Sequence, residues 1–232
     1  MSQLTKLEPE KIIDSVSILE KRISDRFPDS GLKDVCREFL MLAEKTKKNI
    51  SYISKPNIPL KVFSYLIIAV GLGGIIFSFS LINFKVKTFD LEKLVSISNG
   101  MFNNLFLIGA AFLFLITMES RIKRKRAIKS IHKLRVISHV IDMHQLTKDP
   151  YMHNNNKSTK NSPIRSYTKF ELQRYLDYCS EASALIGKVA ALYAQSLPDE
   201  VIVSAVNEIE VLTTGLSRKI WQKIVVIQNL ET

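Results

Sequence analysis

Two long stretches of this 232-residue chain lack any formally charged side chain, although 24% of all residues are Asp, Glu, Lys or Arg. Residues 62–84 are 23 consecutive residues without a charge, and residues 94–118 are another 25. A helix needs about 20 apolar residues to cross the hydrocarbon core of a bilayer. This segregation excludes an ordinary soluble globule with one core and predicts two membrane-spanning helices, at 60–84 and 98–118, joined by a short extracytoplasmic turn at 85–97.

The remaining sequence lacks the alternating pattern of β-strands. Apolar residues at helical spacing predict helices over 8–27 and 32–50, within a cytoplasmic N-terminal segment at 1–55. Residues 54–59, with two prolines, are expected to form an irregular hinge that leads into the first span.

Glycine and proline are also missing between Ala110 and Asp149, so the second span is expected to continue as one helix through a cytoplasmic extension at 119–149. Residues 150–166, rich in Asn, Ser and Lys, are typical of a flexible linker. A C-terminal helical hairpin follows at 167–232. The fold class is therefore expected to be all-α, a two-helix transmembrane hairpin with a cytoplasmic helical bundle.

Two local signals mark the helices of the C-terminal hairpin. Thr168 and Glu171 have the spacing of a capping box at the start of its first helix. Pro198, Asp199 and Glu200 are expected to form the first turn of its last helix, with acids at the positive end of the helix dipole.

The net charge of +11 is spread unevenly along the chain. Residues 119–149 carry nine bases and three acids, a net charge of +6, directly after the second apolar run. Lys and Arg near the end of a span favour the cytoplasmic side, which places both termini in the cytoplasm. Residues 85–93, which carry all the charges of the expected turn, have a net charge of +1 and oppose this orientation only weakly. No apolar region near Met1 resembles a signal peptide.

Small residues in the first span form two pairs at helical spacing, Ala69 with Gly73 and Gly74 with Ser78. Such pairs let two helices approach closely in a membrane. They favour either packing between the two helices of the hairpin itself or packing between subunits around a pore. Neither span contains an ionisable residue, which argues against a proton pump or a coupled ion transporter.

Asn103 and Asn104 are polar residues within the second span. Their amides are expected either to face headgroups at the membrane interface or, in an assembly of several chains, to pair between subunits or line a channel.

The densest basic run follows the second span and suits anionic lipid headgroups as well as the phosphates of nucleic acid. It has no interleaved aromatic residue, which weakens the nucleic-acid interpretation. Its members are Arg121, Lys123, Arg124, Lys125 and Arg126.

Further along the same helix, His132, Arg135, His139 and Asp142 share one face. This polar stripe is expected to pack against the bundle, with a metal site or a pH- or ligand-sensing network as alternatives. Asp142 is spaced to contact His139, and Arg135 to reach either of them.

The chain has only two cysteines, Cys36 and Cys179, which are expected to be reduced thiols in the cytoplasmic part. No spacing of Ser, His, Asp or Cys suggests nucleophilic catalysis. The sequence therefore predicts a protein that is not an enzyme and needs no cofactor.

Two spans joined by a short turn and continued into a cytoplasmic helical domain resemble the two-transmembrane effectors of bacterial anti-phage systems. These include SLATT-type effectors and the transmembrane proteins encoded beside retron reverse transcriptases. The resemblance covers the layout of residues 61–148 and the overall size, and no signature motif carries it. It implies an inner-membrane effector that stays inactive until phage is sensed and then permeabilises the membrane and kills the cell.

For the retron case the resemblance also implies contact with a reverse transcriptase and its RNA–DNA product, or with another sensor of the defence system. The expected partners are thus the lipid bilayer, further copies of the chain in a homo-oligomer, and such a sensor. A membrane-anchored helical scaffold without pore activity remains the alternative.

Overall fold

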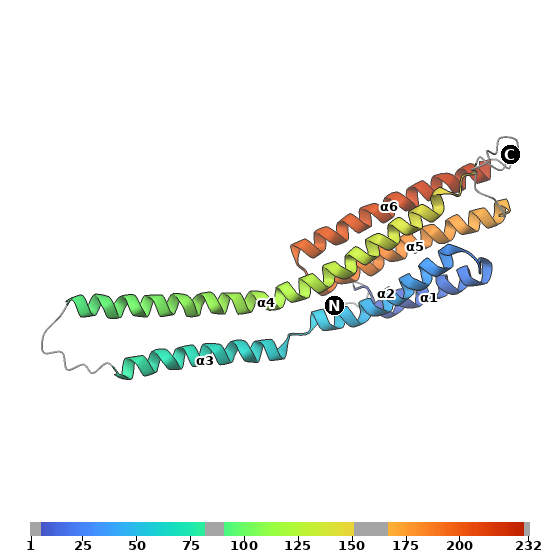
Figure 1. Cartoon of the computed structure of the whole chain (residues 1–232). Helices are drawn as coiled ribbons and strands as arrows, with labels where there is room; N and C mark the ends of the chain where they lie inside the picture. Colours follow the sequence, from blue (N-terminus) through green and yellow to red (C-terminus); the bar gives the residue numbers. More distant parts are fainter. Residues whose placement is uncertain (1–5, 82–90, 151–166, 230–232) are drawn as a thin grey trace. The chain divides into compact units, whose positions relative to one another are not determined.

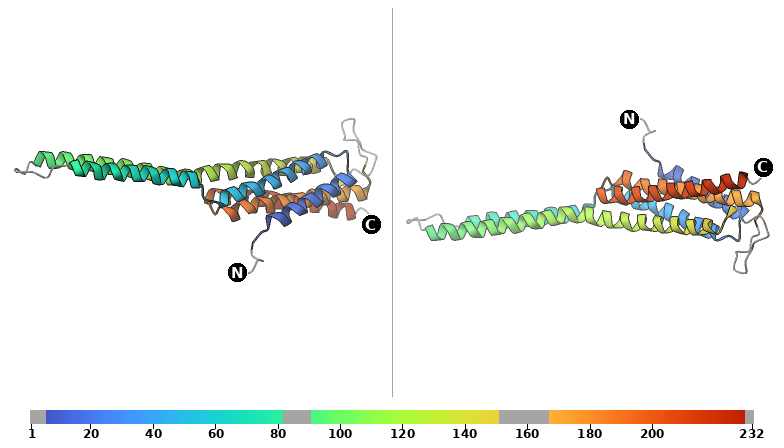
Figure 2. Two further views of the ribbon diagram at one scale, coloured as in Figure 1. Left: turned by 90° about the horizontal axis from the view of Figure 1, so that it is seen from below. Right: turned by 90° about the horizontal axis from the view of Figure 1, so that it is seen from above.

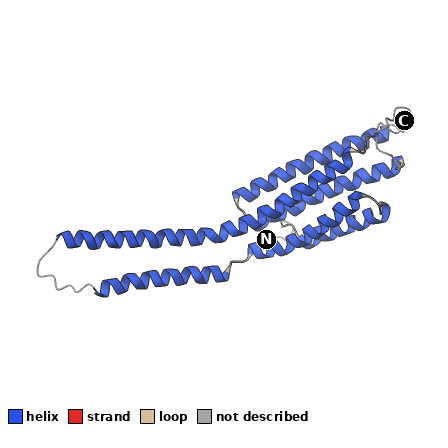
Figure 3. Cartoon of the chain, in the orientation of Figure 1, coloured by secondary structure: helices blue, strands red, loops and turns tan. Residues whose placement is uncertain are grey.

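The computed structural model describes residues 6–81, 91–150 and 167–229. These residues form six helices, labelled α1 to α6 in Figure 1, and the part of the chain that is described contains no strand (Figure 3). The all-α class predicted from the sequence is confirmed. The chain divides into two compact units, residues 55–123 and residues 1–54 with 124–232.

The first unit contains α3 (Ile58–Leu81) and the first part of α4 (Leu91–Leu146). Two helical stretches, one containing most of α3 and one within α4, are long and apolar enough to cross a membrane by length and composition. α4 begins earlier than expected: residues 91–97 were assigned to a turn and are helical, because Leu, Glu and Lys at its start favour a helix. Residues 82–90 lie outside the described part.

α4 is one helix of 56 residues, as the absence of Gly and Pro after Ala110 predicted. It ends at Leu146, and the N–H of Lys148 donates to the carbonyl of Gln145 beyond its last turn. α4 contributes its second part to the other unit.

That second unit is a bundle of α1 (Pro9–Arg26), α2 (Gly31–Ser54), the C-terminal part of α4, α5 (Lys169–Ser196) and α6 (Glu200–Asn229). α5 and α6 pack along each other, and α5 also contacts α1 and α2 (Figure 2). α5 is therefore the helix around which much of the bundle is built.

Each helix of the bundle buries one apolar stripe in a common core. On α5 and α6 the stripes predicted from the sequence are buried, except for Leu212, which is half-buried. The fourteen residues of these stripes that are buried are Leu172, Leu176, Cys179, Ala182, Ile186, Val189, Tyr193, Ile202, Val206, Ile209, Leu216, Ile220, Ile224 and Ile227.

Three helix boundaries differ from expectation. α2 continues to Ser54, because Ile50 and Ile53 are buried and extend its apolar stripe. Only residues 55–57 are non-helical before α3, since Pro59 fits the first helical turn, where no N–H is needed. α6 begins at Glu200 rather than at Pro198, with Asp199 just outside the helix.

Candidate functional site

α3 and α4 meet along a narrow seam within the hairpin. A Cβ atom added to Gly71 would lie 3.3 Å from Cδ1 of Ile108, so Gly71 is where the two helices approach closely. The half-buried residues among the described side chains of α3 fall on this stripe at helical spacing: Leu60, Ser64, Ile67, Ile68 and Gly71. The glycine that packs the hairpin is thus Gly71, which was not among the small-residue pairs taken from the sequence.

The small pair Ala69 and Gly73 lies on the other side of α3. Gly73 follows Gly71 by two residues, about 160° around the helix. Ala69 is exposed, and a Cβ at Gly73 would meet no atom within 4 Å. A Cβ at Gly74 would likewise have open space, whereas the side chain of Ser78 lies outside the described part. The structure therefore does not use the Ala69–Gly73 face to hold α3 against α4.

The rest of the hairpin surface is apolar and exposed. Phe63, Val70 and Phe106, for example, are 55%, 68% and 74% exposed, and Leu115 is the one buried apolar residue among the described part of the two apolar runs. An apolar surface of this extent is typical of contact with lipid or with another protein. The hairpin thus needs a covering that the single chain does not supply.

One face of α4 in this apolar surface is polar. Asn99, Asn103, Ala110 and Thr117 fall within about 40° of one another at 100° per residue, and the exposed Phe106 lies about 20° outside this range. Ala110 is two residues after Ile108, so this face points about 160° away from the contact with α3. We call these four residues the polar face of α4.

The amides and the hydroxyl of the polar face have different surroundings. The hydroxyl of Thr117 donates to the backbone carbonyls of Leu113 and Phe114, at 3.0 Å each. Asn99 and Asn103 are exposed, and their side chains have no hydrogen-bond partner among the residues that are described. Asn104 is exposed as well but lies about 40° from Ile108, near the seam. Of the two predicted amides, only Asn103 belongs to the polar face.

Glu119 forms a polar contact between the starting end of α3 and α4. Its Oε1 accepts the backbone N–H of Asn57 at 2.9 Å and is 2.8 Å from Nζ of Lys123. The Glu119 and Lys123 side chains are only 18% and 13% exposed. The hydrogen bonds from Lys123 and from Asn57 lower the pKa of Glu119, so the carboxylate is charged at neutral pH. No pattern in the sequence predicts this contact, because its partners are 62 residues apart.

In the basic run after the second apolar run, some side chains have a partner among the described residues and others do not. Lys123 pairs with Glu119, and the guanidinium of Arg126 lies 4.0 Å from the ring centroid of Tyr52. Arg121 and Lys125 are exposed, and the described residues supply neither with an ion pair.

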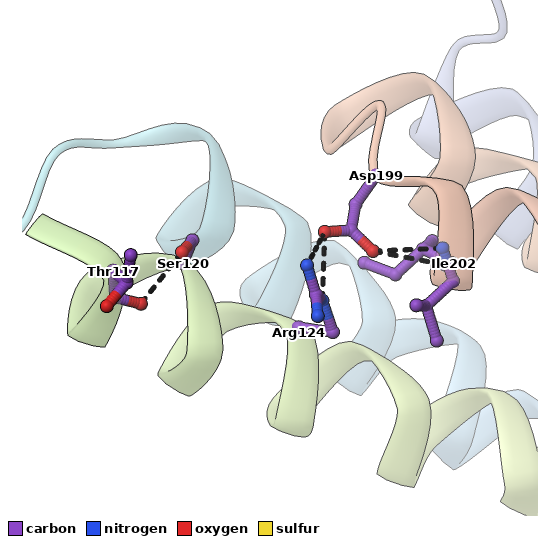
Figure 4. Close-up of polar contacts among 6 residues, drawn as sticks. Thr117, Ser120, Arg124, Asp199 and Ile202 are labelled. Atoms are coloured by element: carbon purple, nitrogen blue, oxygen red, sulfur yellow. Dashed lines mark hydrogen bonds and ion pairs between the residues drawn. The ribbon is translucent and has the colours of Figure 1, made fainter. Parts of the chain in front are cut away.

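Arg124 is the best anchored of the run. Its Nε and Nη2 donate to Oδ2 of Asp199 at 2.9 and 2.6 Å, while Oδ1 of Asp199 accepts the backbone N–H groups of Val201 and Ile202 (Figure 4). Asp199 thus caps α6 and binds α4 at the same time. Burial raises the pKa of Asp199, but these hydrogen bonds outweigh it and leave the pKa lowered.

The polar stripe does not form the internal network that its spacing suggested. Arg135 pairs with Glu208 of α6, and Asp142 accepts a hydrogen bond from Nε2 of Gln145 at 2.6 Å. Gln145 is buried, so its amide depends on a hydrogen bond within the protein, whereas the exposed His139 can bond to water. His132 is exposed and lines a groove between α4 and α6 with Arg135 and Glu208. No group of three or more His, Cys, Asp or Glu side chains in the described residues is arranged to hold a metal.

A buried polar chain joins three helices inside the bundle. The hydroxyl of Tyr193 donates to Oγ1 of Thr46 at 3.2 Å, and Nδ2 of Asn49 donates to Oγ of Ser130 at 3.0 Å and to the Tyr193 hydroxyl at 3.4 Å. Thr46 and Tyr193 are 0% and 1% exposed. Mutual hydrogen bonding of such groups fixes how α2, α4 and α5 are aligned.

Both cysteines are free thiols buried in the bundle core. Burial raises the pKa of Cys36 to about 12 and raises that of Cys179 as well. A thiol rather than a thiolate at neutral pH is a poor nucleophile, so their surroundings fit the expected packing role.

Comparison of the chain with known protein families, with curated proteins and with solved structures finds no match.

Proposed function

We propose that the chain is an inner-membrane effector of a bacterial anti-phage, abortive-infection system, which on activation assembles into a homo-oligomer and permeabilises the membrane. The observation that carries this proposal is the polar face of α4. It lies within an apolar helical stretch and points away from α3, the helix with which α4 packs.

The physical argument concerns the unpaired amide of Asn103. An amide in hydrocarbon without a hydrogen-bond partner is costly, and amides in membranes gain about 0.6–2 kcal/mol by pairing between helices. Asn103, Ala110 and Thr117 recur every seven residues, the repeat at which two helices of the same direction stay in contact. Copies of α4 around a common axis would pair their Asn103 amides or direct them into water.

The bundle and the layout of the chain supply the rest of the proposal. Both termini are cytoplasmic and the protein is multi-pass, as the net charge of +6 on 119–149 favours. The helical bundle holds the hairpins in a resting assembly at normal abundance and releases them when a partner senses phage. Overexpression in cells, or reconstitution at high protein density, takes the place of this signal. The resemblance to retron-associated effectors makes a reverse transcriptase with its RNA–DNA complex the preferred partner.

The direct test follows the membrane potential of cells that overexpress the protein. The wild type should dissipate the potential, and Asn103→Leu should abolish this effect. Asn104→Leu is the matched control, because it removes the neighbouring amide from a different face of α4 and should leave the effect intact. Gly73→Leu should suppress toxicity as well. It adds a large side chain at a position of α3 that is open in the single chain, and so prevents close packing between subunits there.

Two outcomes would contradict the proposal. If the cells die while their membrane potential is intact, the protein is not a pore. If Asn103→Leu and Asn104→Leu behave alike, the polar face of α4 is not the functional surface.

The alternative, a membrane-anchored scaffold, draws on a different observation. An open groove of about 320 Å³ lies between α2 and α4 in the bundle, and Met41, Val136 and Val140 are among its apolar lining residues. Met41 and Val136 are 57% and 60% exposed, as in a surface that receives a partner. A scaffold would keep its function when an unrelated hairpin replaces the two spans, whereas an effector with a pore would lose it.

A further inference from the structure

We infer that the pore conducts anions and that Arg121 sets this selectivity at its cytoplasmic mouth. The inference rests on the proposed function, because it assigns the permeant ion to the pore formed by α4. It depends on where Arg121 lies and on what the other charged groups at this end of the hairpin contact.

Arg121 continues the polar face of α4. It follows Asn103 by 18 residues, which is five full turns, and Thr117 by four. Its side chain is exposed, and no carboxylate of the described chain forms an ion pair with it. If the polar face lines the axis of an oligomer, one guanidinium from each copy stands at the end of the channel.

The nearby acid cannot neutralise this ring. Glu119 lies two residues before Arg121, about 160° around the helix. Its carboxylate is held on the α3 side by the N–H of Asn57 and by Lys123, and only 18% of the side chain is exposed. The two apolar runs, 62–84 and 94–118, contain no Asp or Glu that would attract a cation.

Three of the other four bases of the run are engaged elsewhere, and the fourth, Lys125, is exposed one turn beyond Arg121 without an ion pair among the described residues. Lys123 pairs with Glu119, Arg124 with Asp199, and Arg126 stacks on Tyr52. Rings of Arg or Lys select anions in pores, because the positive potential raises the local anion concentration and repels cations. This effect fades over about 10 Å at 0.1 M salt, so a charge directly at the mouth dominates.

The experiment measures ion selectivity of the purified full-length protein in planar bilayers of neutral phosphatidylcholine under a tenfold KCl gradient. The wild type should show a chloride-to-potassium permeability ratio well above one. Arg121→Gln should bring this ratio close to one, and Arg121→Glu should invert it. Lys55→Glu is the control, since it makes the same change of charge at the same end of the hairpin on an exposed residue before α3. It should leave the ratio unchanged.

The outcomes separate this inference from the proposed function. A wild-type conductance that prefers potassium, or one that Arg121→Glu and Lys55→Glu alter equally, overturns the role of Arg121 while the pore stands. A dependence on Arg121 that is present only in bilayers with anionic lipid assigns the residue to headgroups and also overturns it. The absence of any wild-type conductance contradicts the proposed function itself.

Discussion

Asp199 offers a sharp test of how the bundle is held together, because one carboxylate serves two contacts. Oδ1 accepts the N–H groups of Val201 and Ile202, at 3.1 and 3.4 Å, and Oδ2 binds Arg124. Asp199→Ala removes both contacts. Asp199→Asn keeps the oxygen that caps α6 but removes the negative charge, and Arg124→Met removes only the partner on α4.

The two contributions differ in size. Loss of an N-cap costs about 0.5–2 kcal/mol of helix stability. The ion pair contributes less, about 0–1 kcal/mol, because 43% of the Arg124 side chain is exposed and solvent screens the attraction. We therefore expect Asp199→Ala to destabilise the start of α6 by about 0.5–3 kcal/mol, and Asp199→Asn and Arg124→Met by less than about 1 kcal/mol each.

Amide hydrogen exchange of the full-length protein in detergent micelles measures this locally. A loss of about 1.4 kcal/mol corresponds to tenfold faster exchange. Asp199→Ala should thus accelerate exchange in the first turns of α6 by about tenfold, and Asp199→Asn only slightly. If Asp199→Asn is as fast as Asp199→Ala, the ion pair rather than the cap stabilises this end, and our reasoning is wrong.

Acid provides a second check on the same residue. The pKa of Asp199 is lowered in the folded protein, so its contribution is fully present above the unfolded pKa, about 3.9, and is lost as the pH falls through the lower folded value. Protection of the α6 start should therefore persist to about pH 4 and decline below it. In Asp199→Asn this acid-dependent step should vanish.

Two substitutions and one labelling experiment test the core of the bundle. Leu134 is 0% exposed, so Leu134→Ala should lower the free energy of unfolding of the bundle by about 2–5 kcal/mol, measured by chemical denaturation. A decrease below about 1 kcal/mol would contradict the burial of Leu134. Tyr193→Phe removes the hydroxyl between Thr46 and Asn49 and should cost about 0.5–1.5 kcal/mol in the same assay, whereas no change would mean that water replaces these bonds. Cys36, whose pKa is raised to about 12 by burial, should resist N-ethylmaleimide at neutral pH until the bundle unfolds, and rapid labelling of the folded protein would show that the thiol is accessible.

The sequence predicted features that depend on neighbours along one helix. The capping box of Thr168 and Glu171 is present, with the Thr168 side chain accepting the N–H of Glu171 and the Glu171 carboxylate accepting the N–H of Thr168. The continuity of α4 after Ala110 followed from the lack of Gly and Pro in the same way. Both depend on residues a few positions apart, which a single sequence displays.

Contacts between helices were the part that the sequence did not reveal. Glu119 directly follows the expected span 98–118, and its contact with Asn57 has no signal in the sequence. Arg135 shares a helix face with Asp142, yet it pairs with Glu208. The glycine that packs the hairpin is Gly71, not Gly73. In each case the helix face is evident from spacing, but the partner depends on how separate helices are rotated against one another, and helical periodicity alone does not fix that rotation.

The continuity of α4 has a mechanical consequence. From Asn103 to His139 it runs for 36 residues, about 54 Å, without a Gly or Pro after Ala110 that would allow it to swivel. Torque applied to the His139 end is therefore carried to Asn103 with little loss. A rotation of α4 about its axis by a few tens of degrees would therefore turn the polar face through the same angle.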